Sequence, residues 1–464
     1  MKIIKKYVGD KKFYMMLLAV ALPIIIQNGI TNFVSLIDNI MIGSIGTEEM
    51  TGVSIVNQLF MVFNITIFGL VSGAGIFGAQ FYGKGDEEGV RYTFRFKMIV
   101  CILFSVLAMI VFWVFGDGLI SLFLHEGSED IDLKKTLYFG KQYLMIMLIQ
   151  FIPNAITQAY ASTLRERGQT VVPMVGGVTA VVINVCLNAV LIFGLFGFPA
   201  LGVAGAAIAT CIAKTAETLI VVIWTHSHSK EYEFINGAYR SIYIPRQLIG
   251  KIVVKGTPLV LNEMMWSLGM TFLVQCYSTR GAAVVTSQNI ANTLMNFFNV
   301  VFMSIGSAIS IIIGQLLGAG KMDEAVDTNR KLTFAATFSS AVLGVVVICV
   351  APYFPLIYNT TDEVKSLSTS FLQIAGLFIP LWAFINSAYF AIRTGGKTFI
   401  TFLFDSVYVW IVTLPVAFCM TRFTDVGIIE IYFICQAVDL IKAAIGFTLL
   451  KAKIWVNNIV NDEV

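Results

Sequence analysis

The feature that most constrains this chain is a series of long apolar segments separated by short polar ones. An apolar run of about 20 residues is long enough to cross a bilayer as a helix. Twelve such runs lie at residues 13–42, 51–82, 96–116, 136–164, 170–197, 200–225, 249–278, 283–317, 332–354, 367–392, 398–420 and 426–450. Since 57% of the 464 residues are hydrophobic, a soluble fold would expose large adhesive patches. We therefore predict an all-α membrane protein with twelve transmembrane helices.

The longest polar segment between these runs, residues 226–248, separates six helices from six. A shift of 235 positions relates the two sets. It superposes residues that hydrophobic composition alone would not match: Pro23 on Pro258, Gln80 on Gln315, Gly83 on Gly318 and Gly85 on Gly320. Because each half has an even number of helices, both enter the membrane in the same orientation. We predict a parallel repeat of two pseudo-symmetric lobes, residues 1–229 and 230–464, with a cavity between them.

Lysine and arginine are distributed unevenly between the polar segments on the two sides. If the N-terminus is cytoplasmic, 23 of the 31 basic residues lie in cytoplasmic segments and six lie in outer ones. Positive charge favours the cytoplasmic side of a membrane. We therefore predict a multi-pass protein of the cell membrane with both termini in the cytoplasm.

The remaining composition argues against several other functions. The net charge of +3 is small and the basic residues are dispersed, which does not favour nucleic-acid binding. The seven cysteines all lie in apolar runs without a CxxC pair, so we expect no metal site. We find no His–acid pair or activated-serine motif and predict that the chain is not an enzyme. The glycine-rich residues 71–85 lack the GK[ST] ending of a phosphate loop, so we expect no cofactor and an ion gradient as energy source.

A charged group at the bilayer centre costs about 2.5–3.5 kcal/mol on insertion scales, so each acid inside an apolar run needs an explanation. Asp38 is the sole acid of the first run. It continues a polar stripe of Asn28, Asn32 and Ser35, spaced to share one helix face. Such an acid suits a cation or proton site in an interior cavity. The alternative is a helix-end acid that simply reaches water.

Amide side chains form two further stripes in the first half. They are Gln150, Asn154 and Gln158 in the fourth run, and Asn184 and Asn188 in the fifth. Both stripes are placed to face Asp38 across the first lobe, and Asn188 lies at a similar depth. The alternative for these amides is hydrogen bonding between helices.

The second half contains its own candidate residues. Asn262 and Glu263, adjacent in the seventh run, are candidates for a second cation or substrate site, with a structural ion pair as the alternative for Glu263. Asn292 shares a helix face with other asparagines of the eighth run and is a candidate substrate contact. Asp405 is either functional or an interface residue.

Opposite charges three residues apart recur in the last helix of each half. They are Lys214 with Glu217, and Asp439 with Lys442. Residues at this spacing can pair on one helix. We predict a neutralised structural pair near the cytoplasmic side in each case.

Several stretches of the chain resemble the multidrug and toxic compound extrusion (MATE) family. They are PIIIQNGITNFVSLIDNIMIGSIG, GAQFYGKGDEE, NVCLNAVLIFGLFGFPALGVAGAAIAT, GQLLGAGKMDEA and RTGGKTF. The resemblance runs over nearly the whole chain. It implies a twelve-helix fold of two lobes, with drug or metabolite efflux driven by inward H⁺ or Na⁺.

The resemblance also implies roles for particular residues. Asp38 matches the helix-1 acid that takes part in cation or proton coupling, and Asn154 and Asn184 match polar residues of the same pocket. Asn188 stands where some proton-coupled members carry an acid. The helix-10 acid of sodium-coupled members has no counterpart in residues 368–392. The choice between H⁺ and Na⁺ therefore stays open.

We predict a monomeric antiporter that exports small organic cations in exchange for H⁺ or Na⁺ by rocking of its two lobes. A lipid-linked oligosaccharide flippase of the same superfamily is the alternative. The acids Asp38 and Glu263 favour a cation over an anionic lipid.

Overall fold

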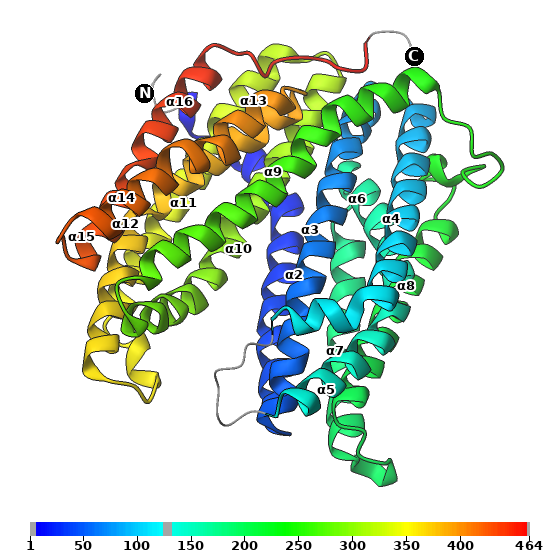
Figure 1. Cartoon of the computed structure of the whole chain (residues 1–464). Coiled ribbons are helices and arrows are strands. Elements are labelled where there is room, and N and C mark those ends of the chain that lie inside the picture. Colours follow the sequence, from blue (N-terminus) through cyan, green and yellow to red (C-terminus); the bar gives the residue numbers. More distant parts are fainter. Residues whose placement is uncertain (1–5, 124–131, 462–464) are drawn as a thin grey trace. The chain divides into compact units, whose positions relative to one another are not determined.

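The computed structural model describes residues 6–123 and 132–461, whose regular elements are helices (Figure 1). The extreme termini, which we predict to be cytoplasmic, lie outside the described residues. The uninterrupted helices are α2 (Lys11–Gly43), α3 (Thr47–Lys84), α4 (Glu87–Ser121), α7 (Val171–Phe193), α8 (Val203–Ser227), α9 (Arg246–Ser278), α10 (Ala282–Gly318), α11 (Met322–Val350) and α12 (Asp362–Thr394). The interrupted ones are α5 (Leu133–Met147) with α6 (Phe151–Glu166), α13 (Thr398–Phe402) with α14 (Leu414–Phe423), and α15 (Ile428–Ala437) with α16 (Asp439–Lys451).

Two of these interruptions have a proline just beyond them. A proline lacks the N–H that would bond the carbonyl four residues back. Pro153 follows the 3₁₀ turn η1 (Leu148–Gln150) between α5 and α6. Pro415 follows two π-helical segments, η5 (Leu403–Val407) and η6 (Val409–Thr413). The second interruption places Asp405 within a widened helical turn.

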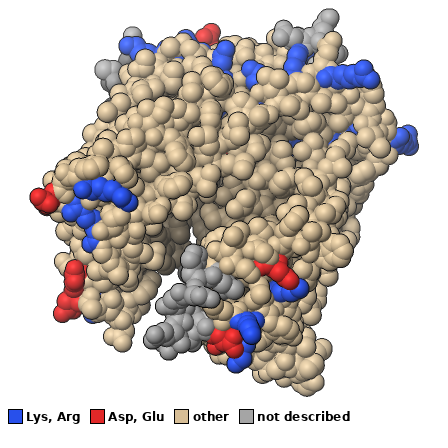
Figure 2. Space-filling view, in the orientation of Figure 1, with Lys and Arg blue, Asp and Glu red and all other residues tan. Residues whose placement is uncertain are grey.

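Eleven helices of the described chain are long and apolar enough to cross a membrane. The twelfth is α9, which has 33 residues but is less apolar, since it contains Lys251, Lys255 and Glu263. On the face shown in Figure 2, charged side chains gather toward the top and bottom of the view and leave a broad uncharged surface between them. Large apolar side chains such as Leu103 and Trp113 are exposed, as expected where a helix meets lipid. The predicted all-α, twelve-helix membrane fold is confirmed.

The chain divides into two compact units. The C-unit comprises the residues up to Ile25, Ala79–Asp86 and Gly250–Val464, and the N-unit comprises Ile26–Gly78 and Glu87–Ile249. Helices α2 and α3 each run from one unit into the other, changing units just after Pro23 and at Gly78. The lobe boundaries, residues 1–229 and 230–464, stay a prediction. The compact units differ from these lobes in that the start of the chain and the end of α3 contribute to the C-unit.

Each unit has its own apolar core. In the N-unit the core joins α3, α4, α5, α6 and α8, and Phe63 and Phe151 stack with ring centroids 4.1 Å apart. In the C-unit, residues of α2 pack with α10 and α12 around Leu17, Ile309 and Ala388. Apolar faces of long helices thus explain the assembly of each unit.

The ends of α3 and α10 cross within the C-unit at residues that the repeat relates. A side chain on Gly83 would collide with the backbone of Gln315, and one on Gly318 would collide with the backbone of Gln80. The contact is reciprocal, because Gly83 corresponds to Gly318 and Gln80 to Gln315. Close approach of two helix backbones needs small residues at the crossing point. The sequence repeat is therefore visible in the packing.

The segment after α16 lies over this crossing. The Gln80 amide donates to the Thr394 carbonyl at 3.0 Å and accepts from the Ile459 N–H at 2.8 Å. Trp455 is 1% exposed, which shows that the segment is part of the C-unit core. Gln80 thereby joins the end of α3, the end of α12 and the C-terminal segment.

We expect Gly318→Ala to destabilise the protein by about 1–3 kcal/mol, because the added methyl group would meet the backbone of α3. Thermal unfolding of the purified protein in detergent measures the effect. Gly250→Ala is the matched control, since Gly250 lies in α9 with open space around its Cα. An unchanged melting temperature for Gly318→Ala would contradict the close crossing.

Candidate functional site

Asp38 of α2 is held by two amide side chains of α7. The Asn188 amide donates to Oδ1 of Asp38 at 2.7 Å. When its amide is oriented to satisfy both neighbours, Asn184 donates to the two Asp38 oxygens at 3.0 Å and accepts from Thr210 Oγ1 at 3.1 Å. Residues four apart lie on one helix face, so both amides reach the same carboxylate. The N-unit therefore brings three of the predicted site residues together.

The oxygen atoms around Asp38 are suited to a proton or a hard cation. Asn188 is 1% exposed, and its Oδ1 is buried without a hydrogen-bond partner in the described part of the chain. Leaving a buried acceptor without a donor costs about 1–3 kcal/mol. Carboxylate and amide oxygens are the ligands that hard cations prefer. An occupant that satisfies Asn188 Oδ1 would relieve this cost.

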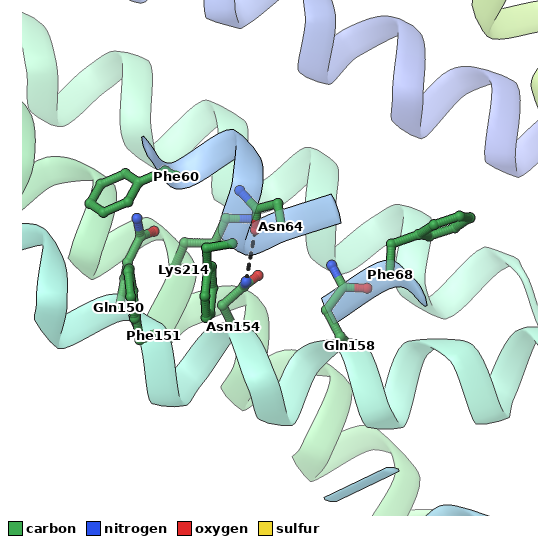
Figure 3. Close-up of a pocket in the computed structure, with 9 residues that line it drawn as sticks. Phe60, Asn64, Phe68, Gln150, Phe151, Asn154, Gln158 and Lys214 are labelled. Carbon is green, nitrogen blue, oxygen red and sulfur yellow. Dashed lines mark hydrogen bonds between the residues drawn. The ribbon is translucent and has the colours of Figure 1, made fainter. Parts of the chain in front are cut away.

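A cavity of about 260 Å³ lies in the N-unit beside the amide stripe of the fourth helix. Gln150, Asn154 and Gln158 line it from one side of that helix (Figure 3). Asn154 donates to Asn64 Oδ1 of α3 at 3.2 Å. The rest of the lining is Phe60, Phe63, Phe68, Phe151 and Lys214. The fourth-helix stripe thus lines a cavity, whereas the fifth-helix stripe contacts Asp38.

The predicted pair of Lys214 and Glu217 is present, with Nζ 2.9 Å from a carboxylate oxygen. Lys214 lies near the middle of α8, however, and not near its cytoplasmic end as the sequence suggested. Its side chain is 36% exposed and lines the cavity, whereas the side chain of Glu217 is 7% exposed. Lys214 therefore lines the cavity as well as pairing with Glu217, while any role in transport stays a prediction.

In the C-unit, the acids form a network with basic residues of other helices. Tyr389 of α12 donates to Glu263 at 3.0 Å, and an Arg393 guanidinium nitrogen lies 3.8 Å from the same carboxylate oxygen. Asn262 donates to Asp405 at 3.0 Å. Glu263 thus has the structural ion pair that was its alternative interpretation, while any role in transport stays a prediction.

The predicted pair of Asp439 with Lys442 is wrong in its partner. Lys442 makes its ion pair with Asp405, at 2.6 Å, across two helices. The widened turn of η5 carries Asp405, and α16 brings Lys442 to it. Spacing along one helix showed that pairing was possible but could not show that a closer carboxylate lay on a neighbouring helix. Asp405 therefore has an ion-pair partner in the C-unit, while any role in transport stays a prediction.

Other predicted residues lie outside these clusters or have a different environment. Asn292 is exposed on α10 and does not belong to the Glu263 network. Lys97 and Arg393 are among the 23 basic residues that the sequence analysis assigned to cytoplasmic segments. Both lie within helices, where they are 1% and 5% exposed. Lys97 pairs with Glu166 at 2.6 Å.

Sequence reasoning missed Thr210, Asn64 and Tyr389 as members of these sites. A signal existed for Thr210, which lies one helical turn before Lys214, and for Asn64, which matches Asn299 under the repeat. Tyr389 carried no such signal, because a tyrosine in an apolar run is ordinary.

The fold and these clusters define a class of protein. Buried acids, ion pairs and an amide-lined cavity within helices of membrane length mark the pathway of a small solute or ion. The described residues contain no group of three His, Cys, Asp or Glu side chains that could hold a metal ion. A multi-pass membrane transporter is the class that fits.

Comparison with known proteins identifies the family. The family model MatE matches residues 23–190 and 258–419, so the chain belongs to the MatE family of transporters and is not an enzyme. The two matches begin at Pro23 and Pro258, the prolines that the repeat superposes. The predicted resemblance to the MATE family is confirmed.

Relatives and solved structures cover most of the chain. It is 23% identical over 416 residues to the "Probable multidrug resistance protein NorM" of Thermotoga maritima, covering 89% of this chain and 87% of the relative. It is 23% identical over 421 residues to the "Probable multidrug resistance protein YoeA" of Bacillus subtilis, covering 88% and 87%. A crystal structure of a MATE protein in complex with MaL6 superposes with a TM-score of 0.86 at 18% identity, covering 98% of each chain. An outward-facing multidrug resistance MATE transporter matches with the same values.

We expect Lys442→Met to destabilise the protein by about 3 kcal/mol, because Asp405 would be left partly buried without its cation. The double variant Lys442→Met with Asp405→Asn should regain much of the loss, whereas Lys442→Met with Asp439→Asn should not. Melting temperatures in detergent compare the three. If stability recovers in Lys442→Met with Asp439→Asn but not in Lys442→Met with Asp405→Asn, then Lys442 pairs with Asp439, as the sequence suggested.

Proposed function

We propose that this protein is a secondary active antiporter that exports small organic compounds, organic cations in particular, in exchange for H⁺ or Na⁺. One observation carries the proposal: Asp38 is held by the neutral amides Asn184 and Asn188, beside a buried amide oxygen that has no donor among the described residues. A carboxylate in such a setting can bind either a proton or a small cation, and the two compete for it.

Coupling needs two states that differ in affinity for the ion and the substrate. Rocking of the two lobes, with Asp38 as the ion site and the N-unit cavity as a substrate contact, provides such states. The passage of α2 and α3 between the units, next to Pro23 and Gly78, supports bending at these points. Relatives named as probable multidrug resistance proteins support drug export.

The same proposal includes location and assembly. The excess of Lys and Arg in one set of polar segments supports cytoplasmic termini in the cell membrane. Both halves of the repeat lie in one chain, which supports a monomer. The flippase alternative is less favoured, because Asp38 carries negative charge in the first lobe.

We expect Asp38→Asn to insert and fold normally but to lose transport driven by an ion gradient, because the amide cannot release or bind a proton at neutral pH. Uptake of a fluorescent organic cation into proteoliposomes is measured with a pH gradient and a Na⁺ gradient imposed separately.

Asp117→Asn is the matched control, because the Asp117 side chain is 54% exposed near the end of α4. Undiminished gradient-driven transport by Asp38→Asn would refute the coupling role. The wild-type response to each gradient decides between H⁺ and Na⁺.

We expect Glu263→Gln to lower turnover or shift substrate preference while leaving the dependence on the imposed ion gradient. Glu263 already has Arg393 as its cation, so its charge stabilises the C-unit. Initial rates in the same proteoliposomes, with Glu430→Gln as an exposed C-unit control, measure the effect. Complete loss of ion-driven transport by well-folded Glu263→Gln would place the coupling in the second lobe.

A further inference from the structure

The lining of the N-unit cavity has an unusual charge composition for a site expected to take cations. Its nine residues are four phenylalanines, four amides and one lysine. No carboxylate lines it within the described residues, and Asp38 is not part of the lining. The formal charge that an occupant meets is therefore the ammonium of Lys214.

The positive charge of Lys214 is only partly balanced by its neighbours. Its carboxylate partner, Glu217, is buried behind the cavity wall and also interacts electrostatically with Arg165. Two cations thus share one carboxylate. An ammonium group has three N–H donors, and in the described part of the chain Glu217 accepts from one of them at 2.9 Å. The remaining donors are available to an anion in the cavity.

The apolar part of the lining is aromatic. Its rings are those of Phe60, Phe63, Phe68 and Phe151. Phe63 and Phe151 stack on each other with centroids 4.1 Å apart, which leaves no room for a ligand ring between them, and Phe68 is 44% exposed. A lining of aromatic side chains favours an aromatic ring as occupant. In Figure 3 the amides of Gln150, Asn154 and Gln158 follow one another along η1 and α6, where they can accept or donate hydrogen bonds.

Figure 3 also shows Lys214 among these amides. A cationic group placed in the cavity would have to approach Lys214 without a lining carboxylate to compensate. Like charges a few ångströms apart repel strongly in a medium of low dielectric constant. An anionic group would instead gain a charge-assisted hydrogen bond.

We propose that Lys214 is a specificity-determining residue that binds the anionic group of planar aromatic ligands in the N-unit cavity. The cavity takes aromatic carboxylates, including the carboxylate end of zwitterions, in preference to aromatic cations. This inference rests on the proposed export function and changes its expected substrate class at the N-unit cavity, where aromatic carboxylates and zwitterions are favoured over purely cationic compounds. The anion site at Lys214 is separate from the ion site expected at Asp38 but lies close to it. Thr210, which contacts Asn184 of the Asp38 site, lies one helical turn from Lys214 on α8.

Equilibrium binding of three fluorescent probes that share one ring tests the proposal. They are 2-naphthoate, neutral 2-naphthamide and cationic 2-naphthylmethylammonium, added to the purified protein in detergent without any ion gradient. We expect naphthoate to bind at least about tenfold more tightly than the ammonium compound, a difference typical of one charge-assisted hydrogen bond. Equal affinity, stronger binding of the cation, or no binding of naphthoate would overturn the proposal.

Variants separate the charge from the packing of Lys214. Lys214→Met should weaken naphthoate at least about tenfold and leave naphthamide unchanged, whereas Lys214→Arg should retain naphthoate binding. Lys214→Met with Glu217→Gln removes both charges and serves if the single variant folds poorly. Lys141→Met, in a solvent-exposed ion pair of the same unit, is the matched control. Equal weakening of naphthoate and naphthamide would reduce Lys214 to a structural role.

The binding assay and the transport assay can refute the two proposals independently. Asp38→Asn should keep the preference for naphthoate, because Asp38 does not line the cavity. Loss of coupling with the preference intact would leave this inference standing, and the reverse result would leave the antiport proposal standing.

Discussion

Placing a charged side chain among apolar helices is costly unless the charge is paired, and this requirement organises the polar residues of both units. Lys97 pairs with Glu166, and Lys442 pairs with Asp405. Asp38 differs from the paired acids, because its contacts are the neutral amides of Asn184 and Asn188. Neutral amide donors stabilise a carboxylate less than a lysine does, so Asp38 keeps more of its affinity for a proton or cation than an acid paired with a lysine. Pairing therefore separates structural acids from the candidate coupling acid.

The repeat supplies a second constraint, which acts through backbone contacts. The crossing of α3 and α10 depends on Gly83 and Gly318. The turns that follow these helices contain Gly85 and Gly320, whose φ angles of 80° and 75° favour glycine. These residues correspond under the repeat, so one packing solution is used twice. Gln80 also binds the C-terminal segment. That contact fixes the end of α3 in the C-unit.

Much of the fold was predictable, because membrane helices are set by length, apolarity and the need to satisfy every backbone hydrogen bond internally. The predicted helix at residues 13–42 corresponds to α2, and the four-residue spacing of Asn184 and Asn188 correctly placed them on one face. Contacts between distant helices were not predictable from spacing. The Asp405–Lys442 pair needed the widened turn of η5, and the exposure of Lys214 to a cavity needed the position of α6. Local periodicity fixes which face a residue occupies but not which neighbour it meets.

The two units share a scaffold but differ in what an incoming ligand would have to displace. An ion or substrate that approached Glu263 or Asp405 would have to compete with Arg393 or Lys442, and breaking a buried pair exposes an uncompensated charge. In the N-unit, Asp38 offers a carboxylate that has no cationic partner in the described part of the chain. Lys214 offers ammonium donors beyond the one that Glu217 accepts from. Binding there creates favourable interactions without breaking an ion pair. The uneven distribution of charge pairs thus places the candidate ion and ligand contacts in the N-unit, although the helices themselves repeat.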